Sequence, residues 1–397
     1  MTWEHKDKVA VVGVGYSPLT RRSPRTLASL TVEACDAALA DAGLARSDID
    51  GIGTNPTMPR YGGEKGVEDG VDVVTPGFLA RELGLAGQIT WECHTQQMVT
   101  VAVMEAVEAI ATGRCRYAIV YRALHMPVGR YSDFSKPRAS GMDQFYAPYG
   151  FTMPAAWAGA VFNRYLHLSG ATRESMANFV VQNRDNAHRN PNAFFRDTPL
   201  AREEYLAGRF VAEPMTMFDC DIPVDGAVAM VLTSRERARD LQKPGALISG
   251  AVLSSHPGVR GVPFTLEALY EGGAQLGQRL WAAAGIGPAE ISAAELYDGF
   301  SIFVWVWLEA LGFCGKGEAF RFIDDGRTRN GGEFPINTSG CSLAEGRVHG
   351  MAQMTEAALQ VMGRAGARQV PRAAHVVATI SNGIGGSTAF VFSRDAR

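Results

Sequence analysis

A phenol and two basic side chains are the groups of this sequence best suited to proton transfer. Tyr297 lies in the segment Glu295–Ser301, and Arg347 and His349 lie together in the segment Gly346–Gly350. A phenol has an ordinary pKa of ~10 and is a poor base at neutral pH. A neighbouring cation, which Arg347 or His349 could supply, would lower that pKa. A neutral Tyr297 could instead relay a proton to carbon, so both roles stay open.

The composition is that of an ordinary globular protein. The 397 residues are 46% hydrophobic and 20% charged and carry a formal charge of -3, so a large core can form. A nearly neutral chain gives no support for nucleic acid or an anionic membrane as the main partner. No apolar run reaches the ~18 residues of a membrane span, and the N-terminus lacks the apolar core of a signal peptide. We therefore expect a cytoplasmic protein that binds neither nucleic acid nor membrane.

The cysteines give no sign of a metal site. None of the six forms a CxxC pair, which argues against both a zinc site and a secreted disulfide framework. The six positions are Cys35, Cys93, Cys115, Cys220, Cys314 and Cys341. We expect no metal to be bound by this chain.

The sequence is internally doubled. Val9–Gly15 is typical of a buried strand, and an apolar-faced helix then runs to Gly43. The second half repeats this order, with a strand at Ala246–Leu253 and a helix at Leu266–Ala284. Duplicated α/β units explain the repeat economically.

Three parts follow from this pattern. Residues 1–121 together with 219–240 form a first half, and residues 241–397 form a second half. Residues 122–218 differ in composition, with many Pro, Tyr, Met, Arg and Asn residues. We expect them to be an inserted loop domain, mostly helical and irregular, that covers the site.

These features together resemble the thiolase superfamily, in its sterol-carrier-protein-x or lipid-transfer-protein branch. The markers are spread over the whole chain: Ala42–Asp50, Ile110–Gly113, Val224–Ala227, the Tyr297 segment, Gly346–Gly350 and Gly383–Gly386. The resemblance implies a thiolase fold. Its duplicated βαβαβαββ halves lie in a layered α/β/α/β/α arrangement, with the inserted loop domain added.

The thiolase nucleophile is absent from its expected place. In the family a Cys begins the central helix about seventeen residues before the glycine that corresponds to Gly113, and this position is Gln96. Cys93 lies one turn too early and would need a three-residue insertion to align. Glutamine cannot form an acyl thioester, so the covalent mechanism of thiolases is not expected.

Two further family positions are also changed. The Cys of the C-x-G-G loop is Gly383, but Gly385 and Gly386 remain, and their N–H groups could bind a thioester oxygen. The His of the G-H-P-x-G loop is Arg347. The sequence is similar to bacterial steroid side-chain retro-aldolases, which carry E-L-Y-D-G-F-S and G-Y-V-H-G with two catalytic tyrosines. Here Tyr297 is kept, and Arg347 stands in place of the second tyrosine.

The resemblance therefore implies an acyl-CoA retro-aldolase, a carbon–carbon lyase. It would cleave a β-hydroxyacyl-CoA with a bulky, steroid-like side chain to a ketone and a short acyl-CoA. Tyr297, Arg347 and His349 would be catalytic. Asp298 is a possible further site residue, and it would oppose ionisation of Tyr297 if its carboxylate pointed inward. No cofactor is expected to be covalently bound, and the coenzyme A thioester is substrate.

The resemblance also implies partners. A homodimer is expected, together with a DUF35-class protein, an OB fold with a zinc ribbon, in an α2β2 complex. Two other functions stay open. One is a thiolase or acyl-CoA acyltransferase that uses Cys93, and the other is a non-catalytic acyl-CoA or lipid-binding subunit of a DUF35-containing complex.

Overall fold

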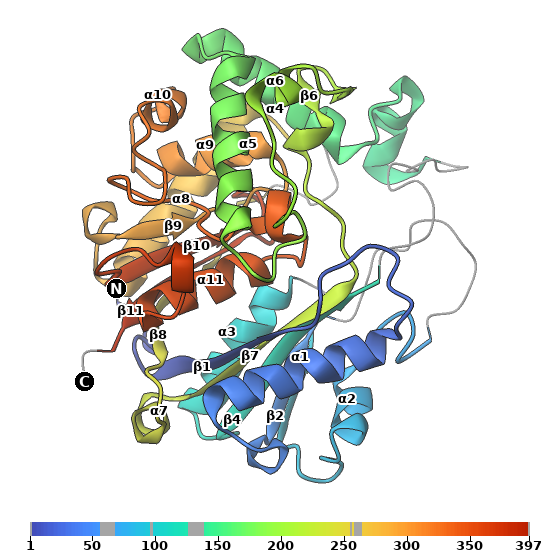
Figure 1. Cartoon of the computed structure of the whole chain (residues 1–397), viewed down its shortest axis with the longest axis vertical. Coiled ribbons are helices and arrows are strands. Elements are labelled where there is room, and N and C mark those ends of the chain that lie inside the picture. The colour runs from blue at the N-terminus through green and yellow to red at the C-terminus, as the bar shows by residue number, and fades with distance from the viewer. Residues whose placement is uncertain are drawn as a thin grey trace.

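One large mixed sheet forms the centre of the protein (Figure 1). The computed structural model describes residues 2–55, 68–95, 98–125, 139–254, 256–257 and 264–395. Within these ranges nine strands pair in the order β3-β2-β4-β7-β1-β8-β11-β10-β9, and β5 and β6 form a separate small hairpin. The strands are β1 Val9–Tyr16, β2 Gly51–Thr54, β3 Trp91–His94, β4 Tyr117–Leu124, β5 Phe210–Ala212, β6 Met215–Thr216, β7 Gly226–Ser234, β8 Ala246–Leu253, β9 Ala293–Glu295, β10 His375–Ile380 and β11 Thr388–Arg394.

Helices cover both faces of this sheet. They are α1 Leu27–Ala42, α2 Pro76–Glu82, α3 Val99–Ala111, α4 Pro154–Ser169, α5 Arg173–His188, α6 Arg202–Leu206, α7 Arg235–Asp240, α8 Leu266–Ala284, α9 Ser301–Ala310, α10 Ala319–Asp324 and α11 Met351–Met362. A π-helical turn at Cys341–Glu345 precedes α11.

The predicted duplication is confirmed by the strand order. The run β2-β4-β7-β1 in the first half is mirrored by β9-β10-β11-β8 in the second. The two halves meet where β1 and β8 pair, at Ala10 with Leu247 and Val11 with Ala246. The predicted duplicated α/β fold is therefore present as one continuous sheet with a short seam.

Side-chain alternation along the strands divides the core into layers. One apolar cluster joins α3 and α11 to β1, β4, β7, β8, β10 and β11. A second lies under α1 and α2, and a third under α4, α5, α8 and α9. The helices α3 and α11 thus form a central layer between the two halves of the sheet, as a five-layer arrangement requires.

Local sequence explains the boundaries of the repeated helices. The Thr26 side chain accepts a hydrogen bond from the Ser29 N–H at the start of α1, which satisfies one of the free N–H groups there. The helix ends at Gly43, whose φ of 73° is in the left-handed region that glycine tolerates. The counterpart α8 spans the predicted residues and ends likewise at Gly285, with a φ of 67°.

The segment between β4 and β7 is mainly helical where the structure describes it. Its helices α4 and α5 (green in Figure 1) pack against α8, α9 and α10 of the second half, and α6 packs on α5. The predicted boundary at residue 122 falls inside β4, because that strand continues to Leu124. The division into three parts stays a prediction.

The strongly apolar run Ile302–Leu308 lies within α9, where it is buried throughout. In the described part of the chain, no helix combines the length and apolar character needed to cross a bilayer.

Candidate active site

Tyr297 follows β9 and lies over the backbone of its own turn. Its N–H donates to Thr379 Oγ1 on β10 at 2.9 Å, and its half-buried ring stacks on Phe303 with centroids 6.4 Å apart. A Cβ added at Gly299 would lie 2.6 Å from Tyr297 Cζ and closer still to the hydroxyl. Only glycine at position 299 leaves room for the phenol in this orientation.

Asp298 is turned toward the π-helical turn and serves the fold. Its carboxylate accepts hydrogen bonds from the N–H groups of Ser342 and Leu343, at 2.8 and 3.1 Å. It also accepts from Gln353 Nε2 and Asn183 Nδ2, at 2.9 and 3.1 Å. Burial raises the pKa of Asp298 to about 6, although the hydrogen bonds from Leu343, Ser342 and Asn183 oppose the shift. Asp298 thus anchors the segment that leads to Arg347, and its role as a site residue stays a prediction.

Arg347 is buried beside an aspartate. Its N–H donates to the Ile222 carbonyl at 2.9 Å, and its Nε lies 3.9 Å from Asp221 Oδ2. The Asp221 N–H in turn donates to the Gly299 carbonyl at 3.2 Å. Burial, and then the negative charge of Asp298, hold the pKa of Asp221 well above its usual range. One short chain of contacts therefore connects Arg347 with the Tyr297 turn.

His349 has a partner that the sequence did not reveal. Its Nδ1 accepts from Arg122 Nε at 3.3 Å and lies 3.1 Å from Arg122 Nη2. Arg122 is on β4, is 1% exposed, and also donates to the Asn55 carbonyl through Nη1. A charged residue within the apolar run Ala118–Leu124 was the available signal, because a buried arginine needs acceptors.

The turn before α11 brings His349 to the end of β10. His349 has a φ of 53° and Gly350 a φ of 95°, both in the left-handed region. A Cβ at Gly350 would lie 2.6 Å from Ile380 Cγ1 and 3.2 Å from Thr100 Cγ2. Since Thr379, beside Ile380, holds the backbone of Tyr297, the turns that carry Tyr297 and His349 meet at the same end of the sheet.

The glycine loop between β10 and β11 lies on α8 and α9. Gly385 and Gly386 have φ values of 20° and 77°. The Ser381 carbonyl accepts from Trp307 Nε1 at 3.0 Å, and a Cβ at Gly383 would lie 3.0 Å from the Gly273 nitrogen. Within the described residues, the N–H groups of Gly385 and Gly386 donate to no protein acceptor. These two donors fit the predicted role of binding an oxygen.

Cys93 is not placed as a helix-start nucleophile. It lies on β3, the edge strand, opposite Gly53 of β2, whereas α3 begins only at Val99. Burial, and then the charge of Glu105, raise the pKa of the Cys93 thiol to about 11. A thiol with a raised pKa is a weak nucleophile. The aligned position, Gln96, lies outside the described residues.

The sequence is similar to a known protein family and to individual known proteins. A family model for the thiolase C-terminal domain matches residues 267–393. The chain is 36% identical, over 95% of its own length and 97% of the other, to 17-hydroxy-3-oxo-4-pregnene-20-carboxyl-CoA lyase of Mycobacterium tuberculosis. This chain belongs to the thiolase superfamily.

Two more members of the superfamily are similar over most of their length. A steroid side-chain-cleaving aldolase of Thermomonospora curvata is 36% identical, over 89% of this chain and 90% of that protein. The solved Ltp2-ChsH2(DUF35) aldolase has a TM-score of 0.84 and 32% identity, with 99% of both chains covered. The superfamily assignment and the fold expected from the sequence are both confirmed.

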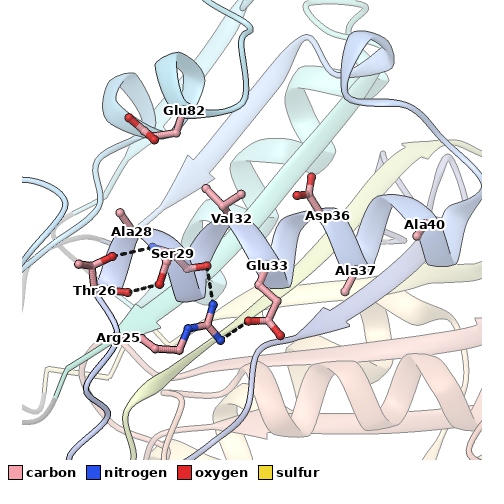
Figure 2. Close-up of a pocket in the computed structure, with 10 residues that line it drawn as sticks. All are labelled: Arg25, Thr26, Ala28, Ser29, Val32, Glu33, Asp36, Ala37, Ala40 and Glu82. Carbon is pink, nitrogen blue, oxygen red and sulfur yellow. Dashed lines mark hydrogen bonds and ion pairs between the residues drawn. The ribbon is translucent and has the colours of Figure 1, made fainter.

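A surface hollow elsewhere on this superfamily member is unrelated to these groups. Figure 2 shows it on the outer side of α1, where exposed and half-buried side chains such as Arg25, Val32, Asp36 and Glu82 line it. Arg25 is held there by the Glu33 carboxylate. The hollow contains none of the residues at the strand ends, so it takes no part in the candidate active site.

Proposed function

We propose that this thiolase-superfamily protein is a carbon–carbon lyase that cleaves a β-hydroxyacyl-CoA with a bulky, steroid-like side chain. The products are a ketone and a short acyl-CoA. The observation that carries this proposal is the 36% identity, over most of each chain, to two proteins whose names describe cleavage of steroid side chains or carboxyl-CoA derivatives.

The proposed reaction needs two proton transfers, one from the substrate to the protein and one from the protein back to the product. A base removes the proton of the β-hydroxyl, the bond between the α- and β-carbons breaks, and its electron pair forms the enolate of the short thioester. The alkoxide carbon becomes the ketone. Protonation of the enolate α-carbon then gives the acyl-CoA. The thioester itself stabilises the carbanion, so a Schiff-base lysine is unnecessary.

The groups at the strand ends match these demands. Tyr297, with its hydroxyl over Gly299, is proposed to transfer the proton. Arg347 is proposed to stabilise the enolate, because a fixed positive charge favours an anion more strongly than a second phenol does. His349 and the N–H groups of Gly385 and Gly386 are further donors for the same oxygen.

The substrate, the partner protein, the oligomeric state and the location are proposed from the same similarity to known proteins. The coenzyme A thioester is the substrate, and no bound cofactor takes part. A DUF35 partner is supported by the similarity to the Ltp2-ChsH2(DUF35) aldolase, a relative whose name includes such a protein. We further propose a homodimer, an α2β2 complex in which the partner carries a zinc ribbon, and a cytoplasmic location.

The direct test is cleavage of a β-hydroxy steroid side-chain CoA ester, followed by mass spectrometry of ketone and short acyl-CoA. The purified chain is assayed with and without a DUF35 protein. We expect Tyr297→Phe to lower kcat by about 1,000-fold, since general acid–base groups contribute 10²–10⁴-fold. Tyr149→Phe, at an exposed tyrosine, is the matched control and should keep wild-type activity.

Each alternative predicts a different result. Tight binding of the CoA ester without cleavage, in every combination, would replace the lyase with a non-catalytic binding subunit. CoA-dependent cleavage of the corresponding β-keto CoA ester that is lost in Cys93→Ala would indicate a thiolase-type mechanism through Cys93.

A further inference from the structure

We infer that Arg122 is a positioning residue that holds His349 in the tautomer with its hydrogen on Nε2, so that the ring offers an Nε2–H donor at the end of the sheet. The tautomer follows from the geometry alone. Its use, donation to the thioester or enolate oxygen, rests on the proposed lyase function.

Strand alternation aims Arg122 at His349. On β4, Ala118, Val120 and Leu124 belong to the central core cluster, whereas Ile119 and Tyr121 belong to the cluster under α1. Successive strand residues point to opposite faces, so Arg122 shares the face of Val120 and Leu124. That face packs against α3 and α11, and His349 lies two residues before α11 begins at Met351.

The direction of the hydrogen bonds determines the tautomer. A guanidinium has five N–H donors and no acceptor. Arg122 Nε and Nη2 both lie within 3.3 Å of His349 Nδ1, so Nδ1 must be the acceptor. A neutral imidazole with an accepting Nδ1 carries its hydrogen on Nε2.

Both partners are fixed independently of each other. Arg122 is 1% exposed and is also held by the Asn55 carbonyl. His349 has a φ of 53°, which a non-glycine residue rarely adopts. Gly350 beside it has no room for a side chain against Ile380. A residue kept in a sparsely populated backbone conformation commonly serves a functional constraint, and here the constraint orients the imidazole.

The decisive experiment reads the two ring nitrogens of His349 directly. The full-length chain is labelled with [¹⁵N]histidine, and a His349→Asn variant assigns the signal among the eight histidines. In wild type we expect a pyridine-type Nδ1 and a pyrrole-type Nε2. In Arg122→Met we expect the two shifts to move toward a tautomer mixture. The buried Arg184, which donates to the Thr198 carbonyl, gives the control Arg184→Met with an unchanged His349 spectrum.

Kinetics then separate positioning from stability. In Arg122→Met we expect kcat for cleavage to fall by about 100-fold with KM changed by less than about twofold, as for a misplaced catalytic group. Arg122→Lys keeps the charge but loses the two-pronged donor. We therefore expect kcat to fall by about tenfold and the nitrogen shifts of His349 to move by less than in Arg122→Met. If Arg122→Met does not fold, Arg122→Lys alone decides the question by the same two measurements.

The two proposals can fail separately. Unchanged His349 nitrogen shifts in the folded Arg122 variants would overturn the positioning role, whatever the activity. Wild-type kcat in those variants would overturn it as well. Absence of cleavage by the wild-type protein, with the expected nitrogen shifts present, would instead remove the lyase function and leave the Arg122–His349 pairing intact.

Discussion

The two halves of the sheet share a strand order but differ in what their loops carry. In the second half, the segments after β9, before α11 and between β10 and β11 hold Tyr297, the Arg347–His349 pair and the glycine loop. The first half contributes Arg122 to His349 and Thr100 to the wall behind Gly350. We propose that one copy of the duplicated unit presents the reactive groups and that the other orients them.

The largest effect after loss of Tyr297 itself is expected at the turn beneath its ring. Gly299→Ala would place a methyl group where the phenol now lies, so the ring must move, and we expect kcat/KM for cleavage to fall by about 100-fold. Gly77→Ala is the control, since a Cβ there meets nothing within 4 Å. Steady-state kinetics of both variants check the comparison, and near-wild-type activity of Gly299→Ala would contradict the placement of Tyr297.

A moderate effect is expected on stability, through a buried carboxyl of the second half. Burial raises the pKa of Glu345 to about 7, above its ordinary value of 4.5. Between these pH values the folded protein holds a proton that the unfolded chain releases. The free energy of unfolding therefore falls as pH rises through this window, by about 3 kcal/mol when the window has been crossed.

The Glu345→Gln variant should not show this decrease in the free energy of unfolding as the pH rises. Denaturant unfolding at pH 5 and pH 8 measures the free energy of unfolding at each pH, with the surface variant Glu333→Gln as control. We expect the stability difference between the two pH values to shrink in Glu345→Gln and to stay unchanged in Glu333→Gln. An identical pH dependence in all three proteins would show that Glu345 ionises normally.

The smallest effect is expected in the first half, at Cys93. Its thiol lies on an edge strand and has a raised pKa. The Cys93→Ala variant should therefore cleave the CoA ester at a rate within about twofold of the wild-type rate. Iodoacetamide should likewise leave the activity in place. A complete loss of cleavage activity in Cys93→Ala would mean that the first half supplies a nucleophile. The proposal that the reactive groups belong to the second half would then be wrong.

Local patterns predicted most of the fold because its elements are specified by near neighbours. The helix at Leu266–Ala284 and the strand at Ala246–Leu253 have the bounds expected from apolar periodicity and a terminal glycine. The boundary at residue 122 was less clear, since nothing local marks the end of β4. Strand ends depend on the neighbouring strand, which here is β7.

The candidate site was predictable only where a motif carried it. The Tyr297 and Arg347 segments were found through family resemblance, and their roles stay predictions. The pairing of Arg122 with His349 joins residues 227 positions apart, and no periodicity within one element connects them. The aspartate beside Arg347 was hidden for the same reason, because Asp221 lies in the loop before β7.

The short seam between β1 and β8 has an evolutionary meaning. Two residue pairs join the ladders of the two halves, so loops at the strand ends of one copy can diverge without changing the register of the other. After a gene duplication and fusion, such a seam leaves one copy free to acquire new chemistry while its twin preserves the scaffold.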